Sequence, residues 1–126
     1  GYDATCRSAA SAIILATCNY ITQTHGNRAE CKRQRAFEPL TEAAITEAIH
    51  RVLMEGMPKS NSATGAPPEM IATTASWAIY GAVKAWVNTP DRPAAEEIVP
   101  IILQLVFPIL YAARALEPET LSVAQG

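Results

Sequence analysis

Two apolar stretches, 70–87 and 98–111, constrain the fold more than any other part of the sequence. The proline-containing segment 88–93 separates them. With helical spacing, apolar side chains lie on more than one side of each stretch, and such a helix must be buried on several sides. A chain of 126 residues is too small to cover two such helices alone. The sequence therefore predicts that a second copy of the chain covers the remaining surface.

The predicted interface consists of one stripe along each stretch. Small residues dominate the first stripe, with Gly81 beside it, and small residues let two helices approach closely. Branched side chains of the second stripe would supply the buried area, which in an obligate dimer exceeds roughly 2,000 Å². The two stripes comprise Ile71, Ala75, Ala78, Ala82, Ala85 and Trp86, followed by Ile98, Ile102, Leu105 and Ile109.

Composition excludes several classes of protein. Apolar residues make up 49 % of the chain, which argues against a disordered protein. The formal net charge is −2 and there is no basic stripe, so this chain is a poor candidate for direct nucleic-acid binding. Three cysteines without CxxC spacing favour neither a disulfide framework nor a zinc site. We expect a cytoplasmic protein with no membrane contact, no metal and no cofactor.

Helical spacing dominates the sequence and strand signals are weak. We therefore expect one all-α domain over 1–126, built as a five-helix bundle whose last two helices form a four-helix-bundle homodimer interface. The expected helices cover 3–24, 28–36, 38–56, 68–88 and a last segment from about 93 through 111.

Local signals predict how some of these helices begin, end and pair. Asp3 can cap the first helix, because its carboxylate can accept the free N–H groups of the first turn. His25 and Gly26 can close that helix, since glycine adopts the left-handed cap conformation. Glu47 and Arg51 have the spacing of an ion pair worth a few tenths of a kcal/mol.

Aromatic, methionine and hydroxyl side chains on several helices predict a small-molecule cavity between them. Any of these residues could instead fill the core, and His50 could instead lie at the surface. The predicted ligand-binding residues are Thr17, Tyr20, Ile21, Phe37, Ile49, His50, Leu53, Met54, Met57, Trp77 and Tyr80.

Groups suited to catalysis are few. Glu96 and Glu97 point in different directions from one helix, so they do not form a carboxylate pair. Cys18 has no basic neighbour in the sequence that would lower its pKa. We therefore expect a protein that is not an enzyme, with His50 the residue to test for the contrary hypothesis of a small all-α enzyme.

The segment 72–86 contains the pattern S-W-A-x-x-G-x-x-x-x-W, formed by Ser76, Trp77, Ala78, Gly81 and Trp86. Followed by a proline-containing turn and an apolar last helix, it resembles the ligand-binding, dimerising domain of TetR-family transcriptional regulators. The expected order of helices matches that domain over nearly the whole chain.

The resemblance implies a homodimeric repressor that senses a small, mainly apolar effector. It also implies that DNA is bound only through an N-terminal helix-turn-helix, which is missing from this sequence. The start at Gly1 without a methionine then suggests a truncated form or a proteolytic fragment. A stand-alone helical protein-interaction module without a ligand pocket is the alternative hypothesis.

Overall fold

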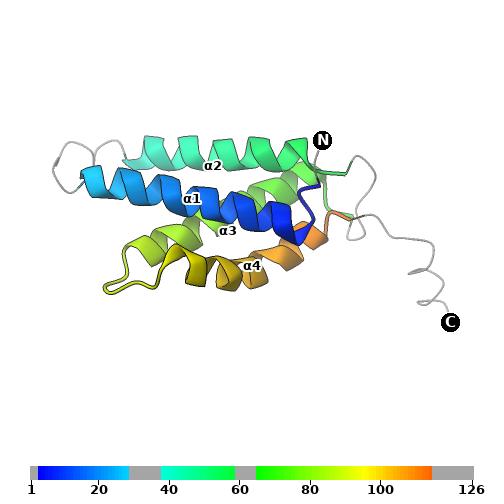
Figure 1. Cartoon of the computed structure of the whole chain (residues 1–126). Helices are drawn as coiled ribbons and strands as arrows, with labels where there is room; N and C mark the ends of the chain where they lie inside the picture. The colour runs from blue at the N-terminus through cyan, green and yellow to red at the C-terminus, as the bar shows by residue number, and fades with distance from the viewer. Residues whose placement is uncertain (1–2, 29–37, 59–64, 115–126) are drawn as a thin grey trace.

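The computed structural model describes residues 3–28, 38–58 and 65–114. Within these residues the chain forms four α-helices and no strand, which confirms the all-α class (Figure 1). The helix expected at 28–36 lies outside the described residues, apart from Arg28, which ends the first helix. The four helices are α1 (Arg7–Arg28), α2 (Glu38–Glu55), α3 (Pro68–Val87) and α4 (Ala95–Tyr111).

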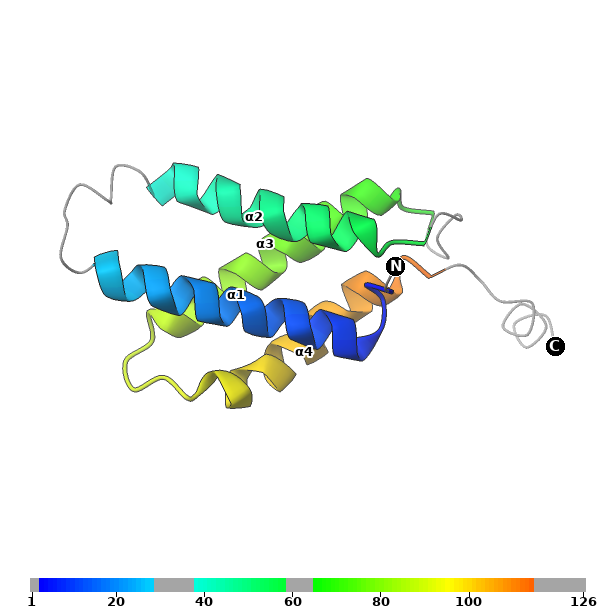
Figure 2. The same cartoon turned by 45° about the horizontal axis from the view of Figure 1, so that its top comes forward.

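Helix α3 is the central element, because it packs against each of the other three helices. Helix α1 also packs along α4, whereas α1 and α2 make little contact with each other. Figure 2 shows α1 and α2 both lying across α3, with α4 on the other side of α1. The helices α1 and α2 are therefore held together through α3 rather than through a shared interface.

The α3–α4 hairpin follows local signals closely. Pro68 occupies the first turn of α3, where the missing N–H is not needed. Asp91 takes a φ of 51° in the turn, a left-handed conformation that aspartate tolerates better than most residues. Helix α4 then begins with Glu96 and Glu97 in its first turn, where negative charge suits the helix dipole.

Both predicted ends of the first helix are wrong. Helix α1 begins at Arg7, because Asp3 closes a preceding turn instead, its carboxylate accepting the Thr5 N–H at 2.9 Å. Cys6 takes the capping position, with its Sγ 3.4 Å from the Ala9 nitrogen. The helix also continues through Gly26 to residue 28, since a glycine inside a helix costs only about 1 kcal/mol relative to alanine.

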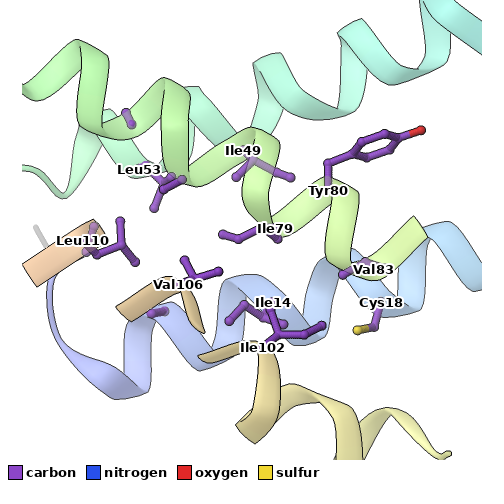
Figure 3. Close-up of a cluster of buried hydrophobic side chains, with 14 of the residues drawn as sticks. Ile14, Cys18, Ile49, Leu53, Ile79, Tyr80, Val83, Ile102, Val106 and Leu110 are labelled. Carbon is purple, nitrogen blue, oxygen red and sulfur yellow. The ribbon is translucent and has the colours of Figure 1, made fainter. Parts of the chain in front are cut away.

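The core lies where all four helices meet (Figure 3). Branched aliphatic side chains make up much of the core, and burying each one contributes about 1.5–3 kcal/mol relative to exposure. The largest fully buried side chains include Ile14 of α1, Leu53 of α2, Ile79 and Val83 of α3, and Val106 and Leu110 of α4.

Among the described helices, none is long and apolar enough to cross a membrane.

Candidate functional site: an apolar groove and an exposed helical face

An apolar groove of about 590 Å³ lies between α1 and α2. It exists because both helices rest on α3 without packing against each other. Its volume falls within the 300–1,000 Å³ typical of small-molecule sites. The lining residues are Ala16, Thr17 and Tyr20 from α1, and Leu40, Thr41, Ala44, Ile45, Ala48 and Ile49 from α2.

The described lining of the groove is uncharged. None of the described residues around it carries a formal charge. The Thr17 hydroxyl donates to the Ile13 carbonyl oxygen at 2.8 Å, so its hydrogen is engaged within α1. Tyr20 is half-exposed and Leu40 more so. The groove therefore suits a ligand that buries apolar surface and makes few directional hydrogen bonds.

The predicted ligand-binding residues do not enclose one common cavity. Thr17, Tyr20 and Ile49 line the groove, whereas His50 and Trp77 line a second hollow on the other side of α2. Four more are buried in the core, namely Ile21, Leu53, Met57 and Tyr80. Met54 is exposed at the surface of α2, and Phe37 lies outside the described residues.

Sequence reasoning missed most of the α2 wall of the groove. Ala44 and Ala48 are one helical turn apart and line the groove together with Ala16 on the facing helix. Alanines at this spacing are also typical of closely packed helices. Whether such alanines line a groove or pack against a neighbouring helix depends on the distance between α1 and α2. That distance is set by how each helix packs on α3.

The second hollow lies between α2 and α3 and has a volume of about 320 Å³. Its lining carries more polar and charged side chains than that of the groove. It consists of Ala43, Thr46, Glu47 and His50 from α2, and Glu69, Thr73, Ser76 and Trp77 from α3.

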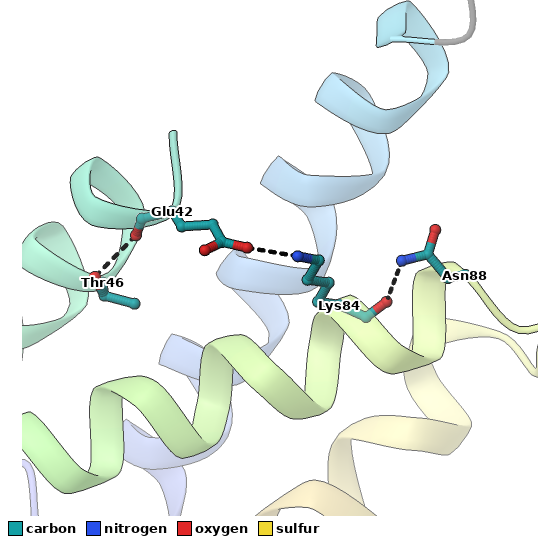
Figure 4. A network of polar contacts seen from close by, with 4 residues as sticks. All are labelled: Glu42, Thr46, Lys84 and Asn88. Carbon is teal, nitrogen blue, oxygen red and sulfur yellow. Dashed lines mark hydrogen bonds and ion pairs between the residues drawn. The ribbon is translucent and has the colours of Figure 1, made fainter. Parts of the chain in front are cut away.

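The charged contacts of α2 differ from the expectation. Glu47 and Arg51 do not form the predicted ion pair; both are exposed, and hydration competes with such a weak contact. Among the side chains that the structure describes, the ion pair is instead Glu42 Oε1 with Lys84 Nζ, which joins α2 to α3 (Figure 4). The Lys84 ammonium also stands 5.9 Å from the centre of the Tyr80 ring.

The contacts of α3 and α4 with the other two helices show which side of each faces its neighbour. Lys84 marks the side of α3 that faces α2. Phe107 marks the side of α4 that faces α1, because the Arg7 guanidinium lies 4.3 Å above its ring. Helical geometry places Ala82 and Ile98 on the opposite sides of α3 and α4, respectively, and both are half-buried against the core.

The outer face of the α3–α4 hairpin carries apolar side chains with little cover. Leu105 is 69 % exposed and Ile101 is 53 % exposed. Gly81 is exposed on α3, and apart from the adjoining backbone of its own helix, a Cβ added there would meet no heavy atom within 4 Å. We call this surface the α3–α4 face. It consists of the exposed Gly81, Ala85, Ile101 and Leu105 and the half-buried Ala78, Ala82, Ile98 and Ile109.

The predicted dimer residues divide between the core and the α3–α4 face. The chain itself buries Ile71, Ala75, Trp86 and Ile102. The structure leaves Ala85 and Leu105 exposed, and Ala78, Ala82, Ile98 and Ile109 half-buried. One side of each predicted stripe is thus covered within a single chain, while the other side is accessible.

No protein-family model, curated protein or solved structure matches the chain. In the described ranges, no group of three or more His, Cys, Asp or Glu side chains could hold a metal ion. A functional proposal therefore depends on the groove and on the α3–α4 face.

Proposed function

We propose that this chain is the effector-sensing and dimerisation domain of a TetR-like transcriptional regulator. The exposed α3–α4 face carries the proposal, because contiguous apolar surface of this kind marks an interaction site. In this proposal the protein acts in the cytoplasm as a repressor, is not an enzyme, and binds DNA through an N-terminal helix-turn-helix outside this sequence.

The α3–α4 face suits a second copy of the same chain. A two-fold axis brings the same patch of both chains together, so each patch must complement itself. The face has both elements needed: protruding side chains at Ile101 and Leu105, and small residues at Gly81 and Ala85. The open space above Gly81 could receive a branched side chain from the partner. The four helices would then form a bundle across the axis.

The groove between α1 and α2 is the proposed effector site. Its apolar lining suits a small, mainly apolar ligand. Because α2 packs mainly on α3 and makes little contact with α1, a ligand wedged between α1 and α2 would shift α2 relative to α1.

A hydrogen bond connects the end of α2 to the described start of the chain. The Ala4 N–H donates to the carbonyl oxygen of Gly56, just beyond the end of α2, at 2.9 Å. Effector binding would thereby move the segment that leads toward an upstream DNA-binding domain. Such coupling between two sites is the physical content of allosteric control.

The effector site is tested with the neutral dye N-phenyl-1-naphthylamine, which fluoresces more strongly in apolar surroundings. Ala48→Phe fills the groove, and we expect it to weaken dye binding about tenfold or more, equivalent to about 1.4 kcal/mol. Ala12→Phe adds the same ring at an exposed position of α1 that does not line the groove, so dye affinity should be unchanged. Dye binding that is absent, or equal in both variants, would contradict the proposal.

The second candidate function is a helical interaction module without a ligand pocket. One observation favours it: Leu53 and other predicted pocket residues fill the core. Such a module would dimerise, or bind another protein, through the α3–α4 face without binding the dye. The dye experiment therefore separates the two functions.

A further inference from the structure

We propose that the second hollow, between α2 and α3, binds a small organic cation, with an alkylammonium group against the indole of Trp77. This inference does not depend on the proposed function. The groove and the α3–α4 face are formed by other residues, so the hollow could bind its ligand whether or not the chain dimerises or senses an apolar effector.

The hydroxyl groups of the hollow present acceptors rather than donors. Thr73 donates its hydroxyl hydrogen to the Glu69 carbonyl oxygen at 2.8 Å, and Ser76 donates to the Thr73 carbonyl oxygen at 2.9 Å. Thr46, on the opposite wall, donates to the Glu42 carbonyl oxygen at 2.8 Å (Figure 4). Each hydroxyl has therefore used its one hydrogen, and only its oxygen lone pairs remain for a ligand.

Two carboxylates give the hollow its charge, one from each wall. Glu47 comes from α2 and Glu69 from α3. In the part of the chain that the structure describes, neither carboxylate belongs to an ion pair, since the pair between these helices is Glu42 with Lys84. Two carboxylates facing one concave surface attract a positively charged ligand.

Trp77 makes an organic cation a better fit than an inorganic one. Its side chain is 50 % exposed, so much of the indole is open to a ligand. Tyr80 holds the indole in a T-shaped contact, with ring centres 6.3 Å apart and planes at 88°. Tryptophan is the aromatic side chain that attracts cations most strongly through its ring face. The described residues also lack the three-ligand cluster that a metal ion would need.

A matched pair of probes isolates the charge. Choline and 3,3-dimethylbutan-1-ol have the same shape, but only choline carries a quaternary ammonium. Calorimetric titration should give choline an affinity at least about threefold higher than that of the neutral alcohol, and this advantage should shrink at high salt. Equal binding of the two probes, or no binding of either, would overturn the proposal.

Substitutions then locate the site. Trp77→Leu, Glu47→Gln and Glu69→Gln should each weaken choline binding by about threefold. Glu96→Gln removes the same charge from the first turn of α4, outside the hollow, and should leave the affinity unchanged. Urea unfolding of each variant verifies that it is folded. The assignment fails if folded Trp77→Leu binds choline as well as the original chain, or if Glu96→Gln weakens binding as much as Glu47→Gln.

Discussion

Arg114, just beyond α4, donates from its Nε to the hydroxyl oxygen of Thr5 at 3.2 Å, joining residues that are 109 positions apart. The same hydroxyl donates its hydrogen to the Asp3 carboxylate at 2.5 Å. Thr5 is almost completely buried. The turn before α1 is therefore held against the end of α4 by a continuous chain of hydrogen bonds.

Thr5→Val should break this chain while nearly preserving the shape of the side chain. The Thr5 hydroxyl and then its backbone N–H lower the pKa of Asp3 below its ordinary value of 3.8. A folded-state pKa below the unfolded one stabilises the protein above pH 3.8, and that contribution is lost as the pH falls through the folded pKa. The substitution should raise the Asp3 pKa toward 3.8, measured by NMR titration of its carboxyl carbon.

The same substitution should cost about 1–2 kcal/mol of unfolding free energy at neutral pH, because the Arg114 donor loses its acceptor. Thr89→Val is the matched control, since the Thr89 hydroxyl is exposed and donates to the Ala85 carbonyl oxygen in the last turn of α3. An unchanged Asp3 pKa in Thr5→Val would show that the hydrogen-bond chain is not formed in solution.

The buried Trp86 side chain of α3 stabilises the connection between α3 and α4. Its Nε1 donates to the Pro93 carbonyl oxygen at 2.8 Å, and the Arg92 guanidinium lies 5.3 Å from its ring centre. Trp86→Phe loses the hydrogen bond and part of the buried ring, so we expect a loss of about 1–3 kcal/mol in urea unfolding. Trp77→Phe, at a half-exposed position, should change stability by less than about 0.5 kcal/mol. Equal losses in the two variants would argue against this role for Trp86.

The Glu42–Lys84 pair should contribute little to stability. Both side chains keep about a third of their surface in water, with relative exposures of 27 % and 35 %. A double-mutant cycle with Glu42→Gln and Lys84→Met should give a coupling energy of about 0.5–1 kcal/mol that shrinks with added salt. A coupling above about 2 kcal/mol would instead indicate a desolvated pair.

Two of the cysteines should differ in reactivity. Hydrogen bonds from Ser8, then from the Ala9 N–H, lower the pKa of the Cys6 thiol, whereas burial raises the pKa of Cys18. Because the thiolate is the reactive form, iodoacetamide should modify Cys6 well before Cys18, and at a lower pH. Mass spectrometry of the Cys31→Ser variant checks this order without interference from the third thiol. Faster modification of Cys18 would mean that α1 opens before Cys6 reacts.

Local signals were sufficient for α2 and α3. The predicted bounds 38–56 and 68–88 lie within one residue of the observed helices, because prolines and turn residues flank both segments. Local signals failed to predict the start of α1, because Asp3 instead caps a turn that Gly56 and Arg114 hold in place. Those partners lie more than 50 positions away, so no local pattern could reveal them.

The candidate sites were less predictable than the helices. Periodicity identified the apolar sides of α3 and α4, but not which part faces the core; Ile102 is buried, while Ile101 and Leu105 are exposed. The groove depends on the distance between α1 and α2, which their own sequences do not determine. Tyr20 and Ile49 were identified by residue type, whereas Ala44 and Ala48 became site residues only through packing.

Sedimentation equilibrium at about 10–100 µM tests the pairing of two chains through the α3–α4 face most directly. The account predicts twice the mass of one chain, reduced to one by Leu105→Glu, which places a charge on the face at a position exposed within the chain. Val52→Glu adds the same charge at an exposed apolar position of α2 and should still give twice the mass. A chain that sediments with the mass of a single copy throughout this range would contradict the account.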